Sequence, residues 1–257
     1  MRNPHGDFIW YELLTTDMEG AARFYAEVFG WDAAPDAPGS HYWMFALGDA
    51  EPGGLMELPS EARACGAEPV WLGYVGVDDV DATLAQAVER GAKVLMPPRD
   101  IEGFGRFALL EDPQGVSFYL GHGAMDERSR AFEPKRTGHC HWNELATRDP
   151  DAALAFFGEL FGWRAGESIP LGALGRYQLL MRGEEGLGAV MAVPPGGRPA
   201  WTFYFGVEDI DAAARAVTEN GGSILQAPTQ VPGGVYSAVA RDPQGAVFGL
   251  VGPRASR

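Results

Sequence analysis

The chain has 257 residues, of which 46% are hydrophobic and 11% aromatic, and its 20 basic and 35 acidic side chains give a net charge of −15. This composition is too apolar for a disordered chain, and no apolar run approaches the roughly 18–20 residues that span a bilayer. The acidic excess argues against nucleic acid and anionic membranes as partners, because both bind basic faces. The N-terminal stretch MRNPHGDF shows no apolar signal segment, so we expect a cytoplasmic protein.

Each half of the chain opens with a strand and a helix. Polar and apolar residues alternate over 8–15 and again over 140–147, the period of a half-buried strand. An Asp suited to cap a helix follows each strand, and apolar residues at i, i+3, i+4 and i+7 then form one stripe that can pack on a sheet. A Gly follows each stripe where a left-handed C-cap belongs. The four cap residues are Asp17, Gly30, Asp149 and Gly162.

A second round of elements follows in each half. Short strands are expected near 42–48 and 53–58, and near 176–182 and 187–192. A longer strand, over 70–77 or 200–207, precedes a helix opened by DDVDA or EDIDA and closed by Gly. Three strands complete each half, the last two joined by the turn sequence DPQG. The order predicts an α+β fold in which each half contains paired β-α-β-β-β units.

The two halves repeat each other. Residues 6–33 and 138–165 are identical at 13 of 28 positions, and residues 74–120 and 204–250 at 18 of 47. This length indicates a duplicated domain, because solenoid units have periods of about 20–50 residues. The charged segment GAMDERSRAFEPKRT separates the copies. We expect a first domain over 1–123, a linker over 124–137 and a second domain over 138–257, as a monomer or a homodimer.

Three motifs in each half resemble one known family. WYELLTTDMEGAARFYAEVFGW, VGVDDVDATLAQAVERGAKV and LLEDPQGVSFYL resemble the vicinal oxygen chelate superfamily, which includes glyoxalases, bleomycin-resistance proteins and extradiol dioxygenases. The second half repeats all three motifs, as in the tandem glyoxalase-like subgroup. The resemblance implies two glyoxalase-like domains, each a cupped mixed sheet with helices outside and a ligand on the concave face.

The resemblance also implies where a metal would bind. The family takes one ligand from the first strand, one from the strand that opens the second unit, and a Glu from the last strand. In this sequence those positions hold Trp10, Leu72 and Tyr119, and in the second half Trp142, Thr202 and Gly249. None of these is His, Glu, Asp or Cys, the residues that divalent metals prefer. We therefore expect no metal and no other cofactor, with a divalent metal as the alternative, and the metal-dependent activities of the family are in doubt.

The residues at and beside the family's metal position suggest that a small molecule binds there. Alternation places Trp10 and Glu12 on one face of the first strand, and Trp142 and Glu144 on the same face of its copy. An indole beside a carboxylate suits a flat molecule that is cationic or donates hydrogen bonds. In the alternative interpretation, the two Trp side chains fill the cups and the two Glu side chains bond buried backbone amides.

Further candidates are weaker. Tyr119 is a candidate general acid or hydroxyl donor, although a simple lining aromatic is the preferred interpretation. Phe104 and Arg106 belong to GFGRF, where loops often cover the family's cup; Arg106 could pair with a ligand anion or form a surface salt bridge. His139 and His141 flank Cys140 and share the strand face opposite to it. Two such histidines can bind a stray transition metal, but we expect no physiological metal site there. The remaining tryptophans, Trp31, Trp71, Trp163 and Trp201, are expected in the helix-sheet core.

Three classes of function remain open. The first is a metal-free protein that binds a small aromatic or apolar molecule, for sequestration or antibiotic resistance of the bleomycin-resistance kind. The second is an isomerase-, lyase- or hydroxylase-type enzyme with Glu12 or Glu144 as general base. The third is an acidic interaction module, because residues 1–125 carry a net charge of −13 and residues 137–257 only −3. The sequence does not choose between a binding protein and an enzyme.

Overall fold

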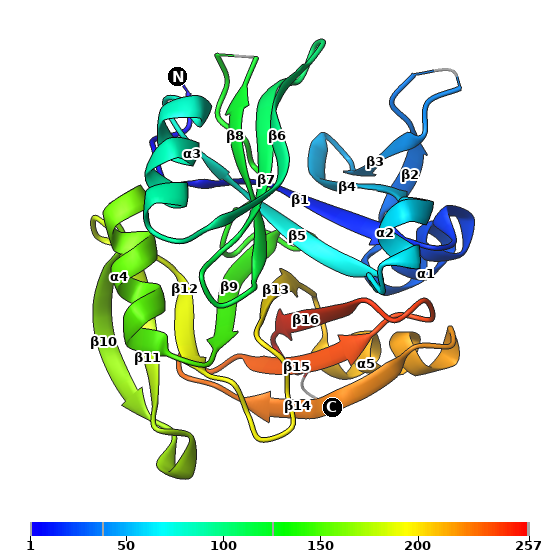
Figure 1. Cartoon of the computed structure of the whole chain (residues 1–257). Helices are drawn as coiled ribbons and strands as arrows, with labels where there is room; N and C mark the ends of the chain where they lie inside the picture. Colours follow the sequence, from blue (N-terminus) through cyan, green and yellow to red (C-terminus); the bar gives the residue numbers. More distant parts are fainter. Residues whose placement is uncertain (1, 38, 125, 256–257) are drawn as a thin grey trace. The chain divides into compact units, whose positions relative to one another are not determined.

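A computed structural model describes residues 2–37, 39–124 and 126–255 of the chain (Figure 1). In the first half, the described residues form strands and helices in the order β1(Phe8–Thr15), α1(Met18–Phe29), β2(Asp32–Pro35), β3(Tyr42–Leu47), β4(Ala50–Glu57), α2(Ser60–Ala64), β5(Val70–Gly76), α3(Val80–Glu89), β6(Lys93–Ile101), β7(Gly105–Glu111) and β8(Ser117–Gly123).

The second half repeats this order, with a 3-10 turn in place of a helix. Its elements are β9(Cys140–Thr147), α4(Pro150–Phe161), β10(Arg164–Pro170), η1(Gly172–Leu174), β11(Arg176–Arg182), β12(Glu185–Ala192), β13(Ala200–Gly206), α5(Ile210–Glu219), β14(Ser223–Gln230), β15(Tyr236–Arg241) and β16(Val247–Gly252). The predicted α+β class and the β-α-β-β-β units are confirmed.

Each half forms one eight-stranded mixed sheet. The strand orders are β2-β3-β4-β1-β5-β8-β7-β6 and β10-β11-β12-β9-β13-β16-β15-β14. The pairs β1–β4, β5–β8, β12–β9 and β13–β16 are parallel, whereas the hairpin pairs are antiparallel. Strands β2 and β10 were not predicted, because they are short or largely exposed edge strands without apolar alternation.

The helix ends follow the predicted caps. Asp17 accepts a hydrogen bond from the backbone of Gly20, and Asp149 accepts from Asp151 and Ala152. The terminating Gly residues of α1 and α4 adopt left-handed φ angles of 72° and 70°. These local signals explain why both helices begin and end where the sequence indicates. No helix among the described residues is long and apolar enough to cross a membrane.

The described residues form two compact units. Unit 1 comprises the described parts of residues 1–10, 72–129 and 142–201, and unit 2 those of residues 11–71, 130–141 and 202–257. Each unit therefore combines half of one repeat with half of the other, while the domain boundaries expected from the sequence follow the repeats and stay a prediction. Unit 1 contains α3 beside α4, and unit 2 contains α1 beside α5.

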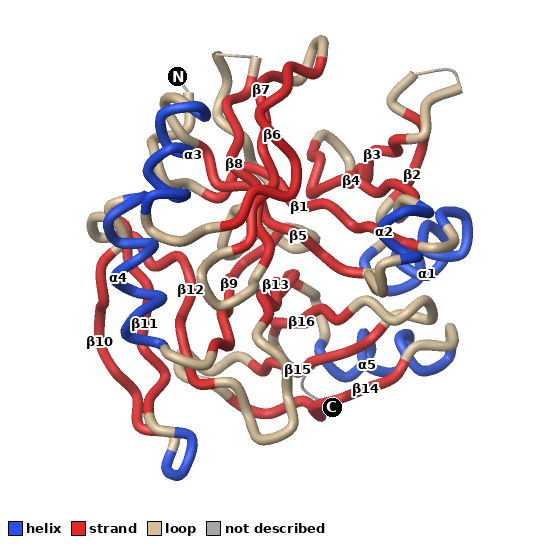
Figure 2. The backbone as a smooth tube through the Cα atoms, in the orientation of Figure 1, coloured by secondary structure: helices blue, strands red, loops and turns tan. Residues whose placement is uncertain are grey.

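Aromatic side chains form the core of each unit. Figure 2 shows the helices and strands that carry them. In unit 1, Phe157 on α4 packs within 5.8 Å of Phe118, Trp163 and Trp201. In unit 2, Tyr25 on α1 lies within 6.1 Å of six aromatic rings: Phe24, Phe29, Trp31, Phe45, Trp71 and Phe248. The expected core positions of the four tryptophans are confirmed, since all are at most 7% exposed.

Candidate functional site

An indole, a phenol and a carboxylate form a hydrogen-bonded chain in unit 1. Trp142 Nε1 donates to the Tyr177 hydroxyl at 2.7 Å, and that hydroxyl donates to Glu144 Oε2 at 2.7 Å. All three side chains are half-buried. We call these three residues the relay. The relay connects the predicted pair, Trp142 and Glu144, through Tyr177, which the sequence motifs did not indicate.

The sheet register explains how Tyr177 reaches the predicted pair. Strand β12 lies between β11 and β9. Tyr177 on β11 is opposite Met191 of β12, and Glu144 on β9 is opposite Ala189 of β12. Met191 and Ala189 are two positions apart and therefore lie on the same face of β12. The small side chain of Ala189 therefore allows the phenol to cross β12 toward β9. A tyrosine at matching positions in YWMFALGD and YQLLMRGE was the signal that could have identified it.

Electrostatics keep the Tyr177 phenol of the relay protonated. Burial raises the pKa of the Tyr177 phenol, and the neighbouring Glu144 carboxylate raises it further. The phenol therefore stays protonated at neutral pH and donates to Glu144 rather than competing with it for a proton. Because a carboxylate accepts about four hydrogen bonds, Glu144 can accept a bond from a ligand in addition to that from Tyr177.

The equivalent residues of the first repeat are in a different environment. Trp10 is half-buried, but the Glu12 side chain is only 3% exposed. Within unit 2, Glu12 pairs in register with Gly54, and the Tyr42 ring lies so close over Gly54 that a Cβ there would collide with it. The two repeats therefore share residue types but differ in how accessible the carboxylate is.

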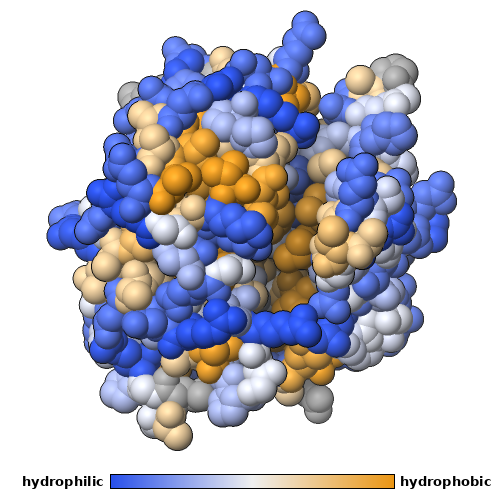
Figure 3. Space-filling model, in the orientation of Figure 1, coloured by the Kyte–Doolittle hydropathy of each residue, from blue (hydrophilic) through white to orange (hydrophobic). Residues whose placement is uncertain are grey.

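The other predicted residues of unit 1 are in separate places. Leu72 is buried, and Tyr119 stacks on Tyr74 with ring centroids 4.0 Å apart. Phe104, between β6 and β7, is 42% exposed. Figure 3 shows further apolar side chains over α3 and β6, where Val88 and Leu95 are exposed.

Arg106 takes part in ion pairs on the protein itself. Its Nε and Nη2 donate to the two carboxylate oxygens of Asp81 on α3 at 2.6 and 2.9 Å, and Nη1 donates to Asp100 at 3.0 Å. This corresponds to the surface salt bridge that the sequence left open, rather than to a guanidinium directed at a ligand.

The residues at the family's metal positions do not fit a divalent metal. In unit 1, Trp10, Leu72 and Tyr119 come from the adjacent strands β1, β5 and β8 and offer a single oxygen, the Tyr119 phenol. In the second repeat the third position is Gly249, and the Tyr204 ring occupies the place where its side chain would begin. Thr202, half-buried on β13, is the other oxygen-bearing residue at these six positions. Among the described residues, no three His, Cys, Asp or Glu side chains gather closely enough to hold a metal.

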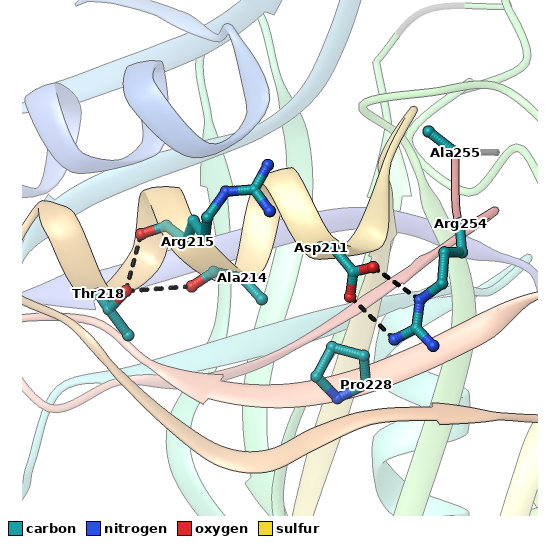
Figure 4. A pocket seen from close by; sticks show the side chains of 7 residues that line it. All are labelled: Asp211, Ala214, Arg215, Thr218, Pro228, Arg254 and Ala255. Carbon is teal, nitrogen blue, oxygen red and sulfur yellow. Dashed lines mark hydrogen bonds and ion pairs between the residues drawn. The ribbon is translucent and has the colours of Figure 1, made fainter. Parts of the chain in front are cut away.

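An open depression of about 760 Å³ lies elsewhere, on α5 of unit 2. Figure 4 shows Arg254 facing Asp211, with its Nε and Nη2 bonded to that carboxylate, while the Arg215 side chain extends in another direction. The Arg254 guanidinium also lies 4.1 Å from the centroid of the Tyr236 ring. Since its charged groups already bind one another or diverge, this depression is a weaker candidate than the relay.

Comparison with known proteins establishes the family. The sequence profile of the Glyoxalase/Bleomycin resistance protein/Dioxygenase superfamily matches residues 8–120 and 136–250. The Mycobacterium tuberculosis protein CFP32, which carries a glyoxylase name, is 35% identical over 248 residues, covering 95% of this chain and 94% of CFP32. The chain belongs to this superfamily, as its motifs indicated.

Two further comparisons add to this. The anthracycline biosynthesis protein DnrV of Streptomyces peucetius is 28% identical over 272 residues, covering 94% of this chain and 91% of DnrV. The fold is similar to that of a Mn(II)-bound glyoxalase from Novosphingobium aromaticivorans, with a TM-score of 0.69 at 17% identity over 98% of this chain and 83% of that one. At this identity the structural likeness concerns the fold alone.

Proposed function

We propose that the protein binds a small planar aromatic molecule at the relay of the second repeat and does so without a metal. The observation that carries this proposal is the Trp142–Tyr177–Glu144 chain of hydrogen bonds, which holds an aromatic ring and a carboxylate side by side. The ligand class follows from these groups: a flat ring system that stacks on indole and carries an N–H or O–H donor for the carboxylate.

The relay defines what each residue presents to such a ligand. The Trp142 N–H is committed to Tyr177, so Trp142 contributes its ring. The Tyr177 hydroxyl both accepts from Trp142 and donates to Glu144, so it holds the two groups in place. Stacking on an aromatic ring contributes about 0.5–1.5 kcal/mol beyond burial, and a hydrogen bond to a charged group about 1.5–3 kcal/mol.

Accessibility favours the second repeat over the first. Glu144 is half-buried, whereas Glu12 is almost fully buried. A ligand can reach Glu144 with little rearrangement, but binding to Glu12 would require the protein to open around it. We therefore assign ligand binding to the second repeat and a structural role to Glu12, Tyr42 and their neighbours.

The comparisons and the donor set support this class of ligand. DnrV is named for the biosynthesis of anthracyclines, which are polycyclic aromatic compounds. The residues at the six metal positions supply two oxygen donors between them, a phenol and a hydroxyl, and no imidazole or carboxylate. Sequestration or processing of an aromatic compound by residues of the chain itself is consistent with both facts.

The test is calorimetric titration with two planar probes, 9-aminoacridine and anthraquinone-2-sulfonate, in chelator-treated buffer. We expect the aminoacridine to bind in preference, and Trp142→Phe, Tyr177→Phe and Glu144→Gln each to weaken it about tenfold or more, which corresponds to about 1.4 kcal/mol. The matched controls Trp10→Phe, Tyr42→Phe and Glu12→Gln should leave its affinity unchanged. Loss of binding in the first-repeat set, or a requirement for added metal, would contradict the proposal.

The same titrations distinguish a binding protein from an enzyme. Mass spectrometry of the probe and of candidate substrates after incubation shows whether any is converted. If a ligand is converted and Glu144→Gln stops the conversion without weakening binding, Glu144 acts as a general base, as in the enzymatic alternative. If every ligand is recovered unchanged, the protein sequesters it.

A further inference from the structure

Gly186, near the start of β12, leaves a small space beside the relay. A Cβ atom at Gly186 would lie 3.7 Å from Trp142 Cζ3, 4.0 Å from Trp142 Cη2 and 3.9 Å from Met181 Sδ, and no atom outside its chain neighbours would be nearer. These are ordinary van der Waals distances, so the space can hold a carbon atom without a collision. We call this space, bounded by Trp142, Met181 and Gly186, the hollow. All three residues are half-buried, so the walls of the hollow are partly open to solvent.

The backbone does not require a glycine at position 186. The φ angle of Gly186 lies outside the left-handed region, so other residues can adopt its conformation. The pairing of β11 with β12 shifts register beside it, but the pairing of β3 with β4 shifts at the corresponding place, where Glu51 takes the position of Gly186. A glycine weakens a strand and often marks a place where a ligand approaches closely. Gly186 therefore points to an occupant of the hollow.

The first repeat lacks the residues that form the hollow. Matching YWMFALGD with YQLLMRGE places Ala46 at the position of Met181, and Glu51 at that of Gly186. In the second repeat the Met181 thioether lies over a further glycine, since a Cβ at Gly166 on β10 would lie 2.7 Å from Met181 Cγ and 3.1 Å from its Sδ. Gly166 therefore leaves room for Met181, and Gly186 leaves room beside it. This arrangement belongs to the same repeat as the accessible carboxylate of the relay.

The indole of Trp142 connects the hollow with the polar end of the relay. Its Nε1 donates to Tyr177, whose hydroxyl donates to Glu144, so the carboxylate lies toward the nitrogen end of the indole. Atoms Cζ3 and Cη2, which border the hollow, belong to the opposite end of the ring system. A ligand that donates to Glu144 and lies along the indole therefore needs about the length of two fused rings to reach the hollow.

We propose that the hollow is an apolar subsite for the outer ring of the ligand, so that the protein selects fused ring systems with one polar end over single rings that carry the same polar group. This inference rests on the proposed function, because it takes the ligand's donor to be bound to Glu144. The outer ring contacts the Trp142 edge and the Met181 sulfur, a pairing that aromatic rings favour. Gly186 keeps the subsite open.

The test compares 9-aminoacridine with 4-aminopyridine, which carries the same aminopyridinium group on a single ring. NMR titration measures both affinities, including weak ones, in the wild type and in two variants. Gly186→Ala fills the hollow with a methyl group, so we expect it to weaken 9-aminoacridine about tenfold or more and to change 4-aminopyridine less than about twofold. The matched control Glu51→Ala, at the corresponding position of the first repeat, should leave both affinities unchanged. Gly186→Ala should also keep the urea midpoint of the wild type, because its Cβ meets no atom at a colliding distance.

An unchanged affinity of Gly186→Ala for 9-aminoacridine, or an equal loss for both probes, would overturn the subsite. Binding at the relay would still stand in that case, because Glu144→Gln tests it separately. If wild-type protein binds neither probe, the proposed function fails and the subsite fails with it. A second measurement uses the wild type: the methyl resonance of Met181 should shift on addition of 9-aminoacridine and stay in place with 4-aminopyridine. A Met181 resonance that responds to neither probe, or equally to both, would also refute the subsite.

Discussion

The described residues include two Trp–Tyr–carboxylate chains of hydrogen bonds, and their different burial predicts different responses to the same substitution. In unit 2, Trp71 Nε1 donates to the Tyr25 hydroxyl at 2.9 Å, and that hydroxyl donates to Asp242 Oδ2 at 3.0 Å. Tyr25 is 0%, Trp71 1% and Asp242 3% exposed. The relay in unit 1 has the same chemistry but is half-buried.

The perturbation is Tyr25→Phe, which removes a single oxygen. Trp71 then loses the acceptor for its N–H, and Asp242 Oδ2 loses the Tyr25 donor, while the backbone amides of Gln244, Gly245 and Ala246 still donate to Oδ1. Each buried polar group left without its partner costs about 1–3 kcal/mol, so for the two groups we expect the free energy of unfolding to fall by about 2–6 kcal/mol. The ring itself is retained, and Phe157 occupies the equivalent buried position of the second repeat, so we expect its packing to be preserved.

Tyr177→Phe is the matched control. Water can reach the half-buried partners of Tyr177 and replace the lost hydrogen bonds, so we expect a cost of about 1 kcal/mol. Urea denaturation followed by tryptophan fluorescence and circular dichroism measures both values. Tyr25→Phe should leave the affinity for the planar probe unchanged, whereas Tyr177→Phe should weaken it. A smaller stability loss for Tyr25→Phe than for Tyr177→Phe would refute the reasoning.

Three further predictions follow from single contacts. Burial lowers the pKa of His141 below its usual value of 6.5. His141 therefore contributes stability above pH 6.5, and this contribution is lost as the pH falls through the lowered pKa. Proton NMR titration should show the lowered pKa, and urea midpoints measured from pH 8 to 5 should show the loss of stability. Arg106→Gln should change probe affinity less than twofold in calorimetric titration, since the Arg106 guanidinium binds Asp81; a tenfold loss would place Arg106 at the ligand instead. Gly188→Ala should lower the free energy of unfolding, measured by urea denaturation, by about 1–3 kcal/mol, because the new Cβ would collide with the backbone of Asn143. An unchanged urea midpoint would show that β9 and β12 can move apart to accept the Cβ.

Local sequence signals accounted for most of the fold. Alternation gave β1 and β9 with the observed bounds, and Asp17, Gly30, Asp149 and Gly162 gave the ends of two helices. These features depend on residues close together in the chain, so a periodicity or a cap is sufficient to predict them. Strands β2 and β10 lacked such a signal because they are short or largely exposed and lie at sheet edges.

The candidate site could be predicted only in part. The sequence paired Trp142 with Glu144 because they are two residues apart on one strand. It could not place Tyr177 between them, since Tyr177 comes from β11, some thirty residues along the chain, and reaches them across β12. Likewise, the pairing of Arg106 with Asp81 depends on how β7 packs against α3.

The sequence by itself determined that this chain is a duplicated member of its superfamily and that the residues at the metal positions of both repeats are poor metal ligands. Those properties depend on residue identity and order alone. Only the tertiary structure decided that the carboxylate of the second repeat, Glu144, is accessible and held by a phenol, while its counterpart Glu12 is buried. Accessibility depends on which distant strands cover a side chain, and two repeats with the same motif can differ in it completely.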